Sequence, residues 1–147
     1  MLKIKKISPM FTSIVTTGEK FKEDMYDEHG VIEASAGDLK AYQKVIAVGP
    51  SVRGIEPGDT VMVNFMNYAV RKYKAGSMKE NMEEYDNSIE GFKFNWITLD
   101  VDGKPQECLL LSDRDVLFSF EGEEVQGKKP KTAKAKIIIP DNKIITN

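Results

Sequence analysis

Few residues of this chain carry side chains that could do chemistry, and each lacks the neighbours that such chemistry needs. The single histidine, His29, follows Asp27 and Glu28, a group that could attract a metal ion. Zinc needs three or four ligands, so a solvated loop histidine is the favoured interpretation. The single cysteine, Cys108, stands in an apolar run with no histidine nearby, which favours a buried core thiol over a nucleophile. A lone cysteine also excludes a disulfide within the chain.

The segment Asp100-Val101-Asp102-Gly103 resembles the start of a calcium-binding loop. The other ligands of such a loop are missing, and a hairpin turn at Asp102-Gly103 explains the segment better, with a loop that looks longer than two residues. No glycine loop for phosphate is present either. We therefore expect no catalytic residue, no metal and no cofactor, and we expect that the protein is not an enzyme.

Composition limits the remaining classes of function. The chain has 147 residues and a formal net charge of -2, which suits one domain with an appendage. There is no basic excess to attract nucleic acid, and no run of about 18 apolar residues to span a bilayer. Residues 1–6 alternate instead of forming the apolar block of a signal peptide. We expect a cytoplasmic protein, in the host cytoplasm if the gene is viral, with no nucleic-acid or membrane partner.

Short β-prone runs with glycine and proline between them occupy most of the chain. They predict an all-β fold, a small and partly open barrel over residues 1–121. The predicted strands cover residues 14–15, 42–48, 60–65, 92–99, 108–111 and 116–120.

Residues 66–91 differ in character and are predicted to be an insertion with a short helix. Ser77 and Glu80 have the spacing of a capping box. One apolar stripe has spacings of 4, 3 and 4, and it consists of Met78, Met82, Tyr85 and Ile89. Packing of this stripe on the barrel is favoured over a protein-binding face. The three aromatic residues Phe92, Phe94 and Trp96 share a strand face, where core packing is favoured and an oligomer interface is the alternative.

The C-terminal residues 122–147 are predicted to be a linker and a β-prone arm. Residues 126–136 contain five lysines, no acidic residue and Pro130, which is typical of a flexible, solvated linker. Contact of these lysines with nucleic acid is the less favoured alternative. Residues 136–140 and 143–146 are short β-prone pieces that need a sheet edge to pair with, in this chain or a neighbour.

A polar, charged stretch between the first two long strands predicts an exposed loop over residues 18–30. Val31 and Ile32 then form a small apolar island. The residues alone leave two interpretations equally open: an anchor that faces inward, or a tip that binds a partner.

Four segments in order resemble the chaperonin-10 family, the GroES-type co-chaperonins. The likeness covers residues 4–65 and 94–121, and the segments are Ile7-Ser8-Pro9, residues 45–49, Pro57-Gly58-Asp59-Thr60-Val61 and residues 109–117. The resemblance implies a GroES-like β-barrel that forms a homo-oligomeric ring, of seven subunits in the family. Such a ring caps an ATP-dependent chaperonin of the GroEL type and assists protein folding, with ATP bound by the partner.

The resemblance also implies which residues meet the partner. A mobile loop with a glycine and apolar residues at its tip docks on the chaperonin apical domains, and the matching positions here are Gly30, Val31 and Ile32. Glu33 stands where the family has a third apolar residue, and its desolvation on docking would cost free energy. The expected oligomer contacts are Ile4, Ile7, Leu117 and Phe118.

Two departures from the family pattern suggest a phage or prophage origin. The segment of residues 49–58 is too short for the hairpin that roofs many relatives, whereas residues 66–91 and 122–147 are extra. Phage-encoded co-chaperonins vary in this way. The alternative to a co-chaperonin is a phage virion or capsid-associated structural protein that reuses the barrel. Glu33 at the docking tip favours it, as does the β-prone C-terminal arm, which is suited to addition to a neighbour's sheet.

Overall fold

The computed structural model describes residues 1–73 and 85–128. The chain divides into two compact units, and each is described by itself. One unit contains Met1–Glu19 and Lys40–Glu121, and the other contains Lys20–Leu39 and Gly122–Asn147. The all-β prediction is confirmed, because every strand from β1 to β10 in the described residues pairs in an antiparallel sheet.

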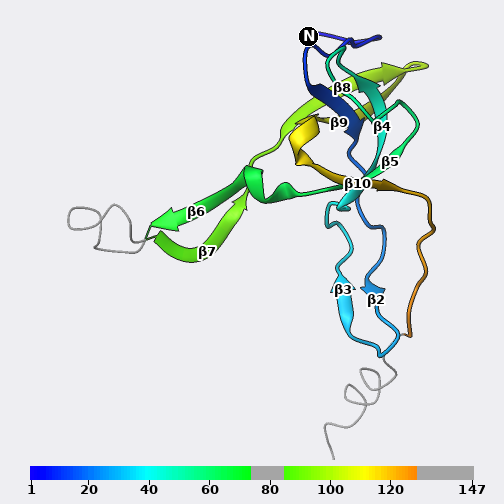
Figure 1. Ribbon diagram of the computed structural model, residues 1–147. Helices are drawn as coiled ribbons and strands as arrows, with labels where there is room; N and C mark the ends of the chain where they lie inside the picture. The colour runs from blue at the N-terminus through cyan, green and yellow to red at the C-terminus, as the bar shows by residue number, and fades with distance from the viewer. Residues whose placement is uncertain (74–84, 129–147) are drawn as a thin grey trace, which may run out of the picture. The chain divides into compact units, whose positions relative to one another are not determined.

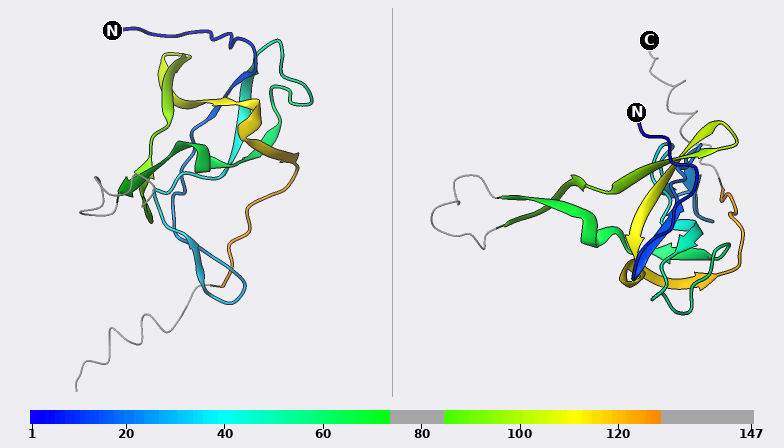
Figure 2. Two further views of the ribbon diagram at one scale, coloured as in Figure 1. Left: turned by 60° about the vertical axis from the view of Figure 1, so that its left-hand side comes forward. Right: turned by 90° about the horizontal axis from the view of Figure 1, so that it is seen from above.

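The first unit is built on a six-stranded antiparallel sheet with the order β10-β5-β4-β1-β9-β8 (Figures 1 and 2). Strands β10 and β8 are its two edges, an arrangement that is compatible with a partly open barrel. The bounds are β1 Ser13–Thr17, β4 Tyr42–Val48, β5 Thr60–Val63, β8 Asn95–Val101, β9 Lys104–Ser112 and β10 Val116–Phe120.

Apolar and β-branched residues of these strands form the core of this unit. Val15, Leu99 and Cys108 are buried together at its centre. Ile4 and Ile7 pack against this cluster from the N-terminal segment, and Ile4 also forms a parallel bridge to Leu99. Burial of such side chains is the main favourable term in the folding of a small domain.

The turn between β8 and β9 has two residues, Asp102 and Gly103. Both have positive φ angles, 52° and 80°, as a tight two-residue hairpin turn requires. The predicted hairpin is therefore present, but the expected longer loop is wrong. Asp100 pairs with Pro105 in the ladder of this hairpin, which agrees with a turn in place of a calcium loop.

The insertion is a β-hairpin where a helix was predicted. A short 3₁₀ helix, η1 (Phe65–Tyr68), leads into β6 (Ala69–Tyr73), which pairs with β7 (Tyr85–Phe92) as a separate two-stranded sheet (Figure 2). The helix prediction is wrong at Tyr85 and Ile89, which lie in β7. Residues four apart share a face in a strand as well as in a helix, so the spacing of Tyr85 and Ile89 could not distinguish a strand from a helix. The capping box, Met78 and Met82 lie outside the described residues.

The second unit contains the predicted loop as a small hairpin. Its stem is closed by a bridge between Lys20 and Leu39 and by a hydrogen bond from the Phe21 amide to the Asp38 carbonyl (2.9 Å). Strands β2 (Met25–Tyr26) and β3 (Ile32–Ala34) pair further along. In Figure 1 the orange segment of residues 122–128 runs beside this hairpin. The two β-prone pieces predicted beyond residue 135 lie outside the described residues.

Within residues 1–73 and 85–128, no helix is long and apolar enough to cross a membrane.

Candidate partner-binding loop

The turn of the loop is organised by Asp27. Its carboxylate accepts hydrogen bonds from the amides of His29 (2.8 Å) and Val31 (2.9 Å). Its main chain also pairs across the turn, because the Asp27 amide donates to the Val31 carbonyl (2.9 Å) and the Gly30 amide donates to the Asp27 carbonyl (3.2 Å). Gly30 has a φ of 83°, a conformation that glycine adopts without strain. One acidic side chain thus fixes the backbone of the loop tip, which we define as Gly30, Val31 and Ile32.

The apolar side chains of the tip lie on the surface. Val31 is 59% exposed and Ile32 is 50% exposed, so the inward-facing anchor is not what the structure shows. Glu33 is exposed beside them. Of the four residues that sequence reasoning assigned to partner binding, Val31, Ile32 and Glu33 are exposed, and Gly30 is half-buried. Exposed apolar side chains on an ordered loop are a common basis of protein recognition.

The order of the tip is expected to depend on pH through Asp27. Hydrogen bonds from the amide of Val31, and then that of His29, hold the pKa of the Asp27 carboxyl below its ordinary value of 3.8. A lowered pKa in the folded state stabilises the turn above the ordinary value, and this stabilisation is lost as pH falls through the folded pKa. We expect the amide NMR signals of His29 and Val31 to shift together below about pH 4. Signals that stay unchanged as the pH falls through this range would contradict the role of the Asp27 carboxylate.

The two ends of the loop meet at Gln43, a buried residue of β4 that sequence reasoning missed. Its amide oxygen accepts from the Thr17 hydroxyl (2.8 Å) and the Glu19 amide (2.9 Å). Its amide nitrogen donates to the carbonyls of Glu19 (3.0 Å) and Lys40 (2.8 Å). Gln43 is only 2% exposed, and all four of its hydrogen-bonding positions are used. It therefore joins the last residue before the loop to the first residue after it.

Replacing Gln43 with leucine is expected to lower the free energy of unfolding by about 2 kcal/mol, because buried donors and acceptors at both loop ends lose their partner. Urea denaturation measures the change. Lys44→Ala is the matched control, since Lys44 is the next residue of the same strand and its side chain is exposed. Equal stability of both variants would contradict a role for Gln43 in closing the loop.

The predicted oligomer contacts fall into two groups. Ile4 and Ile7 are partly buried against the core of their own unit. Leu117 and Phe118 are more than half exposed and lie on β10, an edge of the six-stranded sheet. Strand edges with unpaired backbone groups can pair with a second chain. Of the four predicted residues, Leu117 and Phe118 are therefore the two whose exposed side chains could contact another subunit.

An aromatic cluster surrounds Phe94. Its ring lies 4.9 Å from that of Phe65, 5.5 Å from Tyr68, 5.7 Å from Phe92 and 6.3 Å from Trp96, measured between centroids. Phe92 and Trp96 remain 48% and 40% exposed. Phe94 thus contacts both Phe92 and Trp96 at the surface and not in the core. The predicted single strand over these residues is wrong, because Phe92 ends β7 and Trp96 lies in β8.

Asp115 was not singled out from the sequence, although it is a buried carboxylate with three hydrogen-bond donors. The Asn67 side chain donates to Oδ1 (2.7 Å), while the Tyr68 hydroxyl (2.5 Å) and the Ser112 amide (2.9 Å) donate to Oδ2. Burial, and next the hydrogen bond to Asp115, raise the pKa of Tyr68 far above its ordinary value. These bonds connect η1 to the turn η2 (Asp113–Asp115) between β9 and β10.

The two residues considered for chemistry from the sequence, Cys108 and His29, have different surroundings. Burial raises the pKa of the Cys108 thiol, which disfavours the thiolate that a nucleophile needs. His29 is exposed beside Glu28 (3.3 Å), and no group of three or more histidine, cysteine or acidic side chains among the described residues could hold a metal ion.

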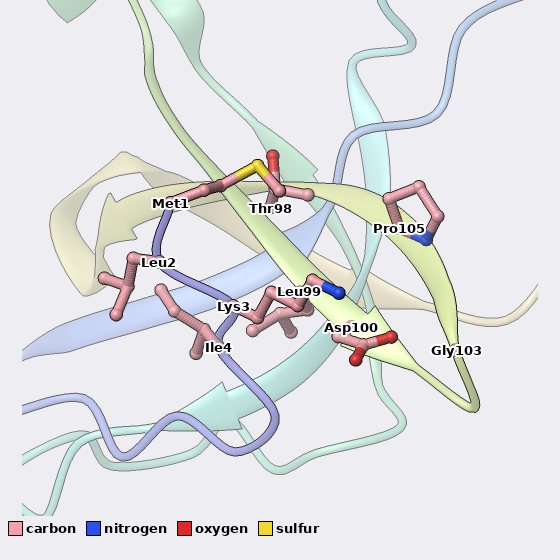
Figure 3. A pocket seen from close by; sticks show the side chains of 9 residues that line it. All are labelled: Met1, Leu2, Lys3, Ile4, Thr98, Leu99, Asp100, Gly103 and Pro105. Carbon is pink, nitrogen blue, oxygen red and sulfur yellow. The ribbon is translucent and has the colours of Figure 1, made fainter.

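A hollow of about 480 Å³ lies between residues 1–4 and the β8–β9 hairpin (Figure 3). Only Lys3, Thr98 and Asp100 among its lining residues offer polar side chains. Met1 and Leu2 on its wall are almost fully exposed, so the hollow is an open surface feature.

No family model matches this chain, and no curated protein matches its sequence. The resemblance to the chaperonin-10 family therefore stays a prediction from the residues.

Proposed function

We propose that this protein is a co-chaperonin, whose loop tip binds an ATP-dependent chaperonin and whose barrel assembles into a ring. The observation that carries the proposal is the exposure of Val31 and Ile32 at the tip of a hydrogen-bonded hairpin. These two apolar side chains leave half or more of their surface in water, and a binding role accounts for that exposure. The ATP would be bound and hydrolysed by the partner.

The expected affinity of one loop is low. Full burial of each apolar side chain contributes about 1.5–3 kcal/mol, and ordering of the interface opposes it. Several loops on one ring bind together by avidity, which turns weak single contacts into stable capping. Such a ring needs contacts between copies, for which the exposed Leu117 and Phe118 on edge strand β10 are suitable. The same weak contacts permit release.

Glu33 sets a condition on the partner. Its exposed carboxylate follows Ile32 directly, so docking of the tip brings it close to the partner's surface. A carboxylate loses solvation there unless a cationic group accompanies it. We therefore expect a chaperonin groove with a lysine or arginine beside its apolar floor.

Native mass spectrometry of the protein, alone and with a chaperonin plus ATP, tests the proposal. A ring that associates with the chaperonin only when nucleotide is present supports it. A different oligomer, or no association, overturns it and favours the structural role in a phage virion or capsid.

A further inference from the structure

Three residues of the C-terminal segment are bound to the loop, although the sequence predicted a flexible linker there. The Gln126 side chain accepts from the Tyr26 amide (2.9 Å), and it donates to the Asp24 carbonyl (2.9 Å) and to the Glu23 carboxylate (2.7 Å). The Gly127 amide donates to the Tyr26 carbonyl (3.0 Å). The Lys128 amide donates to the Asp27 carbonyl (3.1 Å). We call residues 126–128 the strap, and Figure 1 shows them beside β2.

The strap approaches the loop so closely that only glycine fits at its centre. A Cβ atom on Gly127 would lie 2.1 Å from the Asp27 carbonyl oxygen and 2.2 Å from that of Tyr26. Real Cβ atoms do not approach backbone this closely, so any larger residue must push the two segments apart. The strap also reaches the tip, because a Cβ on Gly30 would be 3.2 Å from the Lys128 carbonyl oxygen.

Asp27 is shared by the strap and the tip. Its carbonyl accepts from the amides of both Lys128 and Gly30, while its carboxylate binds the amides of His29 and Val31. A change in the strap that moves the Asp27 main chain is therefore expected to move the backbone of the tip as well. The strap leaves the tip itself uncovered, since Val31 and Ile32 are exposed with the strap in place.

We propose that Gln126 and Gly127 are positioning residues for the loop, which hold the tip in its binding conformation before the partner arrives. This inference rests on the proposed co-chaperonin function. A loop that is ordered in advance loses less conformational entropy on docking, so it binds more tightly than a free loop with the same side chains. The strap has this effect because it binds the strand opposite the apolar side chains and does not compete with the partner for them.

The test compares Gly127→Ala with Gly91→Ala in the full chain. Gly91 is the matched control because a Cβ there meets nothing within 4 Å. Hydrogen exchange of the Gly30 and Val31 amides is measured in the free protein, and affinity for a bacterial chaperonin is measured with ATP present. We expect Gly127→Ala to speed exchange at the tip and to weaken binding, each by about tenfold or more, while Gly91→Ala matches the wild type.

Each result decides a separate point. Unchanged exchange at the tip in Gly127→Ala overturns the strap, whether or not the protein binds a chaperonin. Faster exchange with tighter binding also overturns it, because the strap would then inhibit the loop. If the wild type binds no chaperonin, the proposed function fails, and the exchange data still show whether the strap orders the tip. Gln126→Ala repeats the test through side-chain bonds alone and is expected to change both readouts in the same direction.

Discussion

Ile32→Asp is expected to abolish chaperonin binding while the protein stays folded. Ile32 is half exposed, so its replacement removes little of the burial that stabilises the fold. On docking, the new carboxylate would be desolvated in an apolar groove, which costs free energy unless a cationic group accompanies it. The loss of about 2 kcal/mol at each loop is repeated around a ring, so the total affinity falls below detection. Sedimentation with a chaperonin and ATP measures it.

Val101→Asp is the matched control for this experiment. Val101 is 44% exposed at the end of β8, so the substitution introduces the same charge at a residue of similar exposure in the other unit. The control is expected to bind as the wild type does. Unchanged binding by Ile32→Asp would remove the tip from the proposed interface, and unfolding of Ile32→Asp, monitored by circular dichroism, would show that the residue serves the fold.

The strands could be predicted because each depends on local composition. The runs around Val15, Val45, Val61 and Leu109 are apolar and β-branched, and each becomes a buried strand of the sheet. The turn at Asp102 and Gly103 could be predicted equally well, because these residue types have a strong preference for the backbone conformation of a tight turn. The exposure of the tip could not be predicted in this way, because an apolar island inside a charged stretch can be an inward-facing anchor or a binding tip, and only the structure shows its side chains exposed.

The polar contacts that hold the loop could not be predicted, because they join residues that are distant in the chain. Gln126 and Tyr26 are separated by 100 residues, and Gln43 and Thr17 by 26. A glutamine in a lysine-rich segment resembles any solvated residue until its partners are known. The prediction of a helix in the insertion failed for a related reason. Ile89 pairs with Arg71 in a β-hairpin, and pairing with a distant segment overrides a local helical spacing.

Asp115→Ala is expected to lower the free energy of unfolding by about 3 kcal/mol, the largest effect on stability that we predict. The carboxylate is 3% exposed, and its removal leaves the Tyr68 hydroxyl, the Asn67 amide and the Ser112 amide without their acceptor. Urea denaturation at neutral pH measures the loss. Asp113→Ala is the matched control, because Asp113 is also an aspartate of this turn and the hydrogen bond that its carboxylate accepts from the Ser112 hydroxyl is long, 3.4 Å.

A second readout separates the loss of these hydrogen bonds from a general loosening of the barrel. Burial and the Asp115 hydrogen bond raise the pKa of Tyr68 in the folded state, so this stabilisation is present below about pH 10 and is lost only in strong alkali. In Asp115→Ala the hydrogen bond and the charge disappear together, and ultraviolet titration should show Tyr68 ionising closer to its ordinary pKa. Asp115→Asn keeps one acceptor but no charge, so it should lie between the two. If Tyr68 ionises as before in both variants, burial alone determines its pKa. The hydrogen bonds of Asp115 between η1 and η2 would then contribute less to the free energy of unfolding than we predict.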